Sequence, residues 1–140
     1  MADASGTGPG AGRDDLLEVE LVAADRTVWT GHATMVIART SEGEVGILPH
    51  HAPLLGTLVD GAVLVRQESG DPVVAVVHGG FLSVADNRVG ILAEEAELST
   101  EIDLDEARRD LEAAQGSSED DAVHQQRRAE ARIRAHGMAQ

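Results

Sequence analysis

The stretch SEGEVGILPHHAPLL, residues 41–55, carries more structural information than any other part of this 140-residue chain. Proline fixes φ and lacks an N–H, so Pro49 and Pro53 do not suit a central strand. Glycine permits turn and bulge geometry at Gly43 and Gly46. We predict a hairpin turn, a short strand and then a rigid, kinked loop. Such a loop either crosses the surface without a partner or is presented to one.

Around this stretch, from Leu17 to about Leu98, the apolar pattern is that of β-strands. Residues 17–21 alternate with period two. The further predicted strands are 28–30 with 34–38, 45–48, 62–66, 73–78, 81–84 and 88–93. Asp86-Asn87 predicts a tight turn, and Gly79-Gly80 predicts a strand break. About eight short strands at this spacing predict a β-sandwich or flattened barrel over residues 15–99.

After Leu98 the pattern becomes helical. Residues 105–115 are rich in strong helix formers, with apolar positions at helical spacing at Leu104, Ala107, Leu111 and Ala114. Gly116-Ser117-Ser118 predicts the end of this helix and the cap of a second one that runs to His136. The second helix offers few apolar anchors: Ala122, Val123, Ala129 and Ile133.

We therefore predict an antiparallel helical hairpin over residues 100–140. Two or three buried aliphatic side chains, at roughly 1.5–3 kcal/mol each, barely offset the entropy of ordering the hairpin. A hairpin with so few anchors can detach, and the alternative is a permanently docked or frayed hairpin.

Composition limits the class of protein. Residues 1–14 are rich in Gly, Ala and Ser and predict a disordered N-terminal extension. The chain has no cysteine, which excludes disulfides and thiolate metal sites, and no apolar run of membrane-spanning length. With a net charge of −14 and no lysine, it is not expected to bind nucleic acid or anionic lipid directly.

The charges are segregated near the C-terminus. Twelve acidic residues lie between Glu94 and Asp121, and four arginines follow at 127, 128, 132 and 134. Arg128 and Arg132 are i,i+4 neighbours on one helical face and could form a phosphate fork. Pairing with the acidic tract, or simple solvation, is the alternative.

No motif of an enzyme or a metal site stands out. His50 and His51 are consecutive, so on extended backbone their side chains point to opposite faces and could share one ion only if the loop bends. The chain lacks a Gly-Lys-Ser/Thr phosphate loop and a Gly-x-Ser-x-Gly elbow. We expect no catalytic residue, no metal site and no required cofactor.

The 41–55 stretch resembles the signature Glu-Gly-x-x-Gly-x-x-Pro-x-His-x-Pro-Leu of the epsilon subunit family of rotary F-type ATP synthases. The matching residues are Glu42, Gly43, Gly46, Pro49, His51, Pro53 and Leu54. The resemblance extends over roughly residues 16–133. It includes Gly79-Gly80-Phe81-Leu82-Ser83-Val84, Asn87 and residues 89–96.

The resemblance implies an N-terminal β-sandwich and a C-terminal helical hairpin in a non-catalytic rotor subunit of the central stalk. It implies that the sandwich binds the gamma subunit and sits on the c-ring, at the cytoplasmic face of the cell membrane, as a peripheral protein attached only through the complex. It also implies that the hairpin contacts the catalytic alpha and beta subunits and, when extended, inhibits ATP hydrolysis. The predicted partner-contact residues are Glu42, Gly43, Glu44, Pro49, His51, Pro53 and Leu54.

The family also carries an ATP-binding pattern, Ile/Leu-Asp-x-x-Arg-Ala, on the hairpin. Leu104 to Arg108 fits it, and Arg109 stands where the family has Ala. With the second-helix pattern Arg-Ala-x-x-Arg, the resemblance implies a regulatory ATP site at Asp105, Arg108, Arg128 and Arg132. Two other interpretations stay open: a free-standing sensor of a nucleotide or small ligand, and a cupin-like metalloenzyme.

Overall fold

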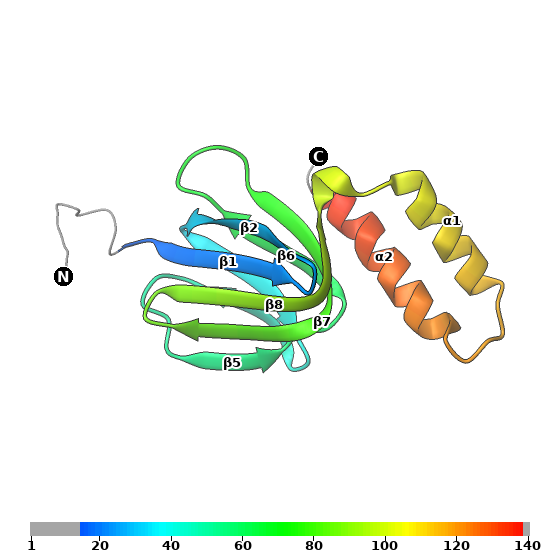
Figure 1. Cartoon of the computed structure of the whole chain (residues 1–140), viewed down its shortest axis with the longest axis horizontal. Helices are drawn as coiled ribbons and strands as arrows, with labels where there is room; N and C mark the ends of the chain where they lie inside the picture. The colour runs from blue at the N-terminus through cyan, green and yellow to red at the C-terminus, as the bar shows by residue number, and fades with distance from the viewer. Residues whose placement is uncertain (1–14, 139–140) are drawn as a thin grey trace.

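The computed structural model describes residues 15–138, and the extension predicted for residues 1–14 lies outside them. The chain forms a two-layered β-sandwich followed by a helical hairpin (Figure 1), which confirms the predicted fold class. The strands are β1 (Leu17–Ala23), β2 (Arg26–Ala33), β3 (Met35–Thr40), β4 (Gly43–Ile47), β5 (Leu54–Thr57), β6 (Gly61–Arg66), β7 (Val73–Ala85) and β8 (Arg88–Leu98). A 3₁₀ turn, η2 (Ser99–Glu101), leads to helices α1 (Leu104–Gln115) and α2 (Ala122–Met138).

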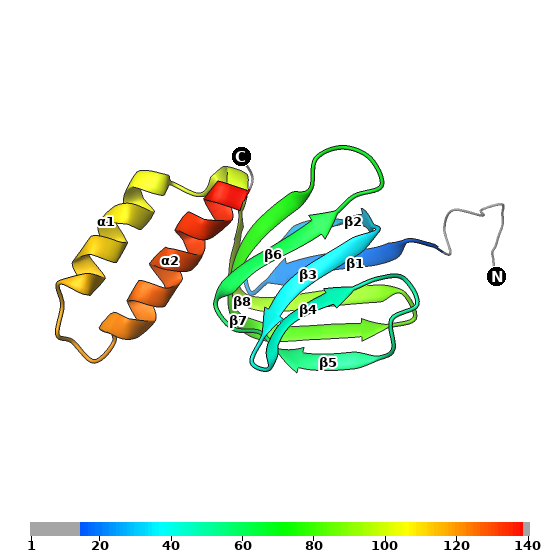
Figure 2. The ribbon, with the colours of Figure 1, turned by 180° about the vertical axis from the view of Figure 1, so that it is seen from behind.

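The described strands form one hydrogen-bonded sheet in the order β2-β1-β8-β7-β6-β3-β4, with β5 paired to β7. The strands β1 and β8 run parallel, and the other pairs are antiparallel. The sheet folds into two layers because the two longest strands, β7 and β8, bend and pass from one layer to the other (Figures 1 and 2). The first half of β7 pairs with β6, and its second half pairs with β5.

The bend lies at Gly79-Gly80, where the sequence predicted a strand break. That prediction is wrong, because β7 continues and keeps its register with β8 from Ala75↔Leu98 to Ala85↔Arg88. What changes is the side of the strand that faces the core. Ala75 and Val77 point inward before the glycines, and Leu82 and Val84 point inward after them. Period-two alternation is therefore reset within one continuous strand.

Both glycines have backbone angles that favour glycine, with φ of 71° at Gly79 and 113° at Gly80. A Cβ at Gly80 would lie 2.0 Å from the carbonyl oxygen of Leu92 on the neighbouring strand. The close approach of two backbones at the corner of the sandwich thus requires glycine at position 80.

The core between the layers consists almost entirely of Val, Leu, Ile and Ala, and Leu17, Ile47 and Ile91 are fully buried. The predicted Asp86-Asn87 turn is confirmed: both residues have positive φ, 51° and 62°, as a two-residue hairpin of type I′ requires. Strand β5 was not predicted. Its four residues include Gly56 and follow Pro53 directly, so they carry no strand signal of their own.

The hairpin differs in detail from the prediction. Asp103 caps α1 by accepting a hydrogen bond from the Glu106 N–H at 3.0 Å. The cap predicted for α2 at Gly116-Ser117-Ser118 is wrong, because α2 begins only at Ala122. It also passes the predicted end at His136 and reaches Met138. Helix α2 lies between the sandwich and α1 (Figures 1 and 2).

The structural role of Gly80 gives the first prediction. We expect Gly80→Ala to lower the free energy of unfolding by about 3 kcal/mol, because the added methyl group collides with the Leu92 carbonyl and alanine is strained at this φ. Urea denaturation of the full chain measures the effect.

The matched control is Gly90→Ala on β8. A Cβ there would meet only the Ser83 Cβ, at 4.0 Å, which is an ordinary contact. We expect the free energy of unfolding of this variant to lie within about 0.5 kcal/mol of that of the native chain. Equal destabilisation by both substitutions would contradict the corner role of Gly80.

Candidate functional site

The Pro-His loop, residues 48–53, joins β4 to β5 and is held to the opposite turn of the sandwich. The backbone N–H of His50, a residue with a φ of 70°, donates to Asn87 Oδ1 at 2.6 Å. The His51 N–H donates to the Leu48 carbonyl at 3.1 Å, and the His51 Nδ1 lies 2.6 Å from the Ala52 carbonyl oxygen. The loop is therefore fixed by its own bonds and by the β7–β8 turn.

The predicted partner-contact residues fall into two groups at opposite ends of β4. Glu42, Gly43 and Glu44 lie at the β3–β4 turn, which bonds to the end of β5 through the Ser41 N–H and the Thr57 carbonyl. The other group, Pro49, His51, Pro53 and Leu54, lies at the Pro-His loop and the start of β5. Leu54 is half-buried against the core, so its side chain does not extend the exposed part of this group.

An exposed apolar face adjoins the Pro-His loop. We define the apolar face as Leu55, Phe81 and Leu92, whose exposed fractions are 76%, 56% and 56%. Phe81 and Leu92 are direct cross-strand partners, and Leu55 lies diagonally across from Phe81 on β5. Contiguous exposed apolar side chains on a small protein mark a surface that contacts something else.

Sequence reasoning missed the apolar face. The available signal was Leu92, which occupies the outward position of a strand whose inward residues are Val89, Ile91 and Ala93. The other signal was Phe81, which comes directly after Gly80 and is one of only two aromatic residues in the chain.

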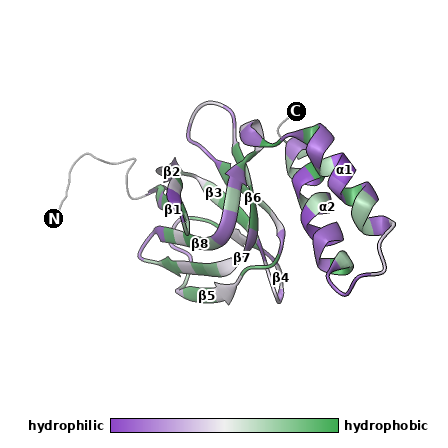
Figure 3. Ribbon diagram, turned by 45° about the vertical axis from the view of Figure 1, so that its right-hand side comes forward, coloured by the Kyte–Doolittle hydropathy of each residue, from purple (hydrophilic) through white to green (hydrophobic). Residues whose placement is uncertain are grey.

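The second candidate region is the junction between the hairpin and the sandwich. Ala131 and Ala135 of α2 pack on the outer face of the sheet against Val74, Val76 and Ile102, with Ala62 and Leu64 at the margin. The helices are coloured largely as hydrophilic in Figure 3, apart from short apolar segments. Val123, predicted as an anchor, is 61% exposed instead. Small alanine side chains therefore make the docking contact, and the apolar area that holds α2 is limited.

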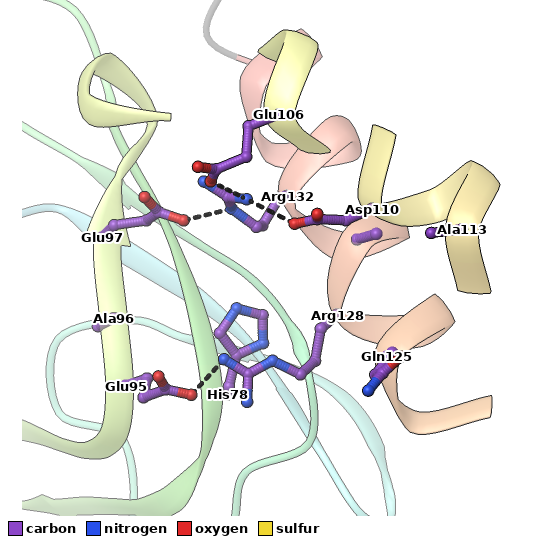
Figure 4. A pocket seen from close by; sticks show the side chains of 11 residues that line it. His78, Glu95, Ala96, Glu97, Glu106, Asp110, Ala113, Gln125, Arg128 and Arg132 are labelled. Atoms are coloured by element: carbon purple, nitrogen blue, oxygen red, sulfur yellow. Dashed lines mark hydrogen bonds and ion pairs between the residues drawn. The ribbon is translucent and has the colours of Figure 1, made fainter. Parts of the chain in front are cut away.

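Two arginines of α2 flank this contact and bind acids of β8 (Figure 4). Arg128 forms an ion pair with Glu95. Arg132, 14% exposed, donates from Nε to Glu97 at 2.6 Å and reaches Glu106 at 2.9 Å and Asp110 at 3.6 Å on α1. Burial lowers the pKa of Arg132, but its bonds to Glu97 and Glu106 outweigh this and raise the pKa above its usual value. Arg132 thus joins the sandwich, α1 and α2.

His78 lies under α2 at the same junction and is 6% exposed. Its Nδ1 lies 3.3 Å from the Asp60 Oδ1, at the segment that precedes β6. Burial and the nearby Arg128 lower the pKa of His78, and Asp60 opposes them only partly. His78 is therefore neutral near pH 7.

A cavity of about 640 Å³ opens between the hairpin and β8, lined by His78, Arg128, Arg132 and the four carboxylates Glu95, Glu97, Glu106 and Asp110, among others (Figure 4). Two of the four predicted ATP-site residues, Arg128 and Arg132, line it. Asp105 and Arg108 do not, and both are exposed on α1.

The expected convergence of Arg108 with the α2 arginines is therefore not found. Arg108 is two positions beyond Glu106, and two residues turn an α-helix through about 200°, so it points away from the cavity. The residues that α1 contributes to the lining are Glu106, Asp110 and Ala113. The cavity offers a ligand two guanidinium groups that are already paired with carboxylates.

Two further observations bear on the class of site. Within residues 15–138, no group of three or more His, Asp or Glu side chains is arranged to hold a metal ion. No helix in the same range is long and apolar enough to cross a membrane.

Comparison with known proteins identifies the family. Residues 16–99 match the family model described as the ATP synthase delta/epsilon chain β-sandwich domain. An ATP synthase epsilon chain from Streptomyces coelicolor is 56% identical over 119 residues, which cover 85% of this chain and 94% of that protein. The epsilon chain from Nocardia farcinica is 48% identical over 112 residues, which cover 79% and 86% of the two chains.

Chains in solved ATP synthase structures have the same fold as this chain. A chain in the structure of the Euglena gracilis mitochondrial ATP synthase, OSCP/F1/c-ring, superposes with a TM-score of 0.68 at 25% identity, over 97% of this chain and 83% of that one. A chain of the Tetrahymena thermophila mitochondrial ATP synthase central stalk/c-ring has the same fold, with a TM-score of 0.55 at 19% identity, over 88% and 95%. These matches do not favour a free-standing ligand sensor. The match to the family model and the identity with curated relatives establish that the chain belongs to the ATP synthase epsilon chain family.

Proposed function

We propose that this non-catalytic subunit of the ATP synthase rotor docks on the gamma subunit through its apolar face, and that its helical hairpin is a movable brake on ATP hydrolysis. The exposed side chains of Leu55, Phe81 and Leu92 carry the first part of the proposal. When a partner covers these apolar side chains and removes them from water, the complex is stabilised by about 25 cal/mol per Å² of buried apolar area. The subunit would lie at the cytoplasmic face of the cell membrane, attached through the complex alone.

The two groups of contact residues at the ends of β4 suit two different partners. The Pro-His loop leads directly into β5, so Pro49, His51 and Pro53 extend the apolar face and would contact the gamma subunit with it. The β3–β4 turn with Glu42, Gly43 and Glu44 lies at the other end of β4, and we propose it as the contact to the c-ring. The loop loses little conformational entropy on binding because its own hydrogen bonds already hold it.

The docking proposal predicts that Phe81→Glu and Leu92→Glu each weaken copurification of this subunit with the gamma subunit by at least about tenfold, since each places a charge in an apolar contact. Both side chains are more than half exposed, so the isolated chain should keep its melting temperature. Pull-down from detergent-solubilised enzyme, with circular dichroism of the free variants, measures both effects.

Val123→Glu is the matched control, because Val123 is equally exposed but lies on α2. We expect it to copurify like the native chain. Retention of the gamma subunit by both face variants would refute the docking assignment.

The limited apolar contact of α2 supports the movable hairpin. The buried side chains that α2 packs on the sheet are the small ones of Ala131 and Ala135, and arginine–carboxylate pairs lie at the margin of the contact. A docked form held this way is separated from an undocked form by only a few kcal/mol, a gap that a modest ligand or partner can reverse. In the undocked form the hairpin would extend toward the catalytic alpha and beta subunits.

We expect deletion of residues 104–140 to raise ATP hydrolysis by the assembled enzyme severalfold without preventing assembly, because the brake is removed. Steady-state hydrolysis by membranes that carry the truncated subunit measures this. Unchanged hydrolysis in a fully assembled enzyme would show that the hairpin has no braking role.

If the hairpin is a brake, Arg132→Gln should change ATP hydrolysis in the opposite direction to the deletion. This variant removes the bond from α2 to Glu97 of the sandwich, worth about 1.5–3 kcal/mol, and with it the bond to Glu106 within the hairpin. More of the hairpin is then free to extend, and hydrolysis should fall below that of the native enzyme. Arg134→Gln, an exposed arginine on the same helix, should have no effect. An Arg132→Gln enzyme that hydrolyses ATP faster than the native one would contradict this direction.

Regulatory ATP binding stays a prediction. At this cavity it would require Arg128 and Arg132 to exchange Glu95 and Glu97 for phosphate oxygens. The four carboxylates of the lining oppose an anionic ligand.

A further inference from the structure

We propose that acidification releases the hairpin from the sandwich, and that His78 is the residue whose protonation opposes docking. His78 is on the outward side of β7, directly under α2, and the docked helix is what buries it. The proposal rests on the movable hairpin described above and assigns it a regulatory signal.

The charges that face His78 belong to two bodies that separate when the hairpin leaves. The sandwich contributes Asp60, 3.3 Å away, and Glu95, which is the cross-strand partner of His78 on β8. It also contributes Glu94 and, at the edge of an adjoining hollow of about 550 Å³, Arg39. These groups stay beside His78 whether or not α2 is docked.

The hairpin contributes mainly positive charge. Arg128 pairs with Glu95 next to the His78 ring. Arg127 and Arg134 line the adjoining hollow together with one acid of α2, Glu130. Glu106 and Asp110 of α1 line the neighbouring cavity, where both face Arg132. His124 of α2 lies with its Nδ1 3.9 Å from the Asp60 Oδ2 and is 56% exposed.

The direction of the pH effect depends on which of the influences on the pKa of His78 disappear when the hairpin leaves. Burial and Arg128 lower the pKa of docked His78, and both disappear when α2 detaches. Asp60 and Glu95, which raise that pKa, remain on the sandwich. The undocked ring therefore binds a proton more readily than the docked ring.

By linkage, docking is fully stable above the pKa of the undocked ring and weakens as the pH falls below it. The docking constant should drop by up to about tenfold per pH unit, the limit for one proton. His124 of α2 also forms a long pair with Asp60, at 3.9 Å. Its exposure to solvent makes that pairing weak.

The full chain can be tested by fluorescence energy transfer. It has no cysteine, so labels at V123C and L48C, both exposed positions, report the distance between α2 and the sandwich without competing thiols. We expect the undocked fraction to rise as the pH is lowered from about 8 to about 5.5. His78→Gln, which cannot become charged, should abolish this response, whereas His124→Gln should retain it.

A second measurement uses the chain without substitution of His78. The NMR titration of the His78 ring should follow the same midpoint as the change in energy transfer. An undocked population that does not vary with pH, or a response that survives in His78→Gln, would overturn the role of His78 and leave the movable hairpin intact. A hairpin that stays docked at every pH, even in the Arg132→Gln variant, would contradict both the role of His78 and the movable hairpin.

Discussion

The close approach of two backbones at Gly80 is the constraint on which the rest of the structure depends. Because β7 and β8 bend together there, one pair of strands serves both layers of the sandwich and encloses the core between them. The same bend resets which residues of β7 point outward. Val74, Val76 and His78 face the hairpin before it, and Phe81 faces outward on the apolar face after it. A single strand thereby contributes to both the hairpin junction and the apolar face.

The two functional regions are stabilised in different ways. The apolar face is built on paired strands with fixed cross-strand neighbours, so it is rigid and suits a lasting contact within a rotor. The hairpin contacts the sandwich through two alanines, arginine–carboxylate pairs and the His124–Asp60 pair. The segment that leads into α1 is fixed separately. The Arg26 guanidinium of β2 donates two hydrogen bonds, of 2.7 and 3.0 Å, to the Glu101 carboxylate of η2. Because the segment before α1 is fixed and the helices are weakly held, the hairpin can leave the sandwich while that segment stays bound.

Much of the fold could be predicted from local signals. The kinked loop at Pro49 and Pro53, the Asp86-Asn87 turn and the helical pattern after Leu98 all depend on residues whose conformational preferences act locally. Gly79-Gly80 was recognised as special, but its effect was not. Local pattern cannot distinguish a break in a strand from a change of the inward side, because only the neighbouring strand decides between them.

The site was harder to predict for a related reason. Arg128 and Arg132 were placed on one face of α2, but their partners depend on how the helix is rotated against β8, which the sequence does not specify. Arg108 was expected beside them but does not line the cavity and is exposed on α1. Leu92 and Phe81 resemble core residues in the sequence, and only the sheet register shows that they point outward.

The most direct test of this account is a cryo-electron microscopy structure of the complete ATP synthase that contains this chain. The account predicts that Leu55, Phe81 and Leu92 are covered by the gamma subunit, with the Pro-His loop at the edge of the same contact. Density for the gamma subunit over a different surface, with these three side chains open to solvent, would contradict it.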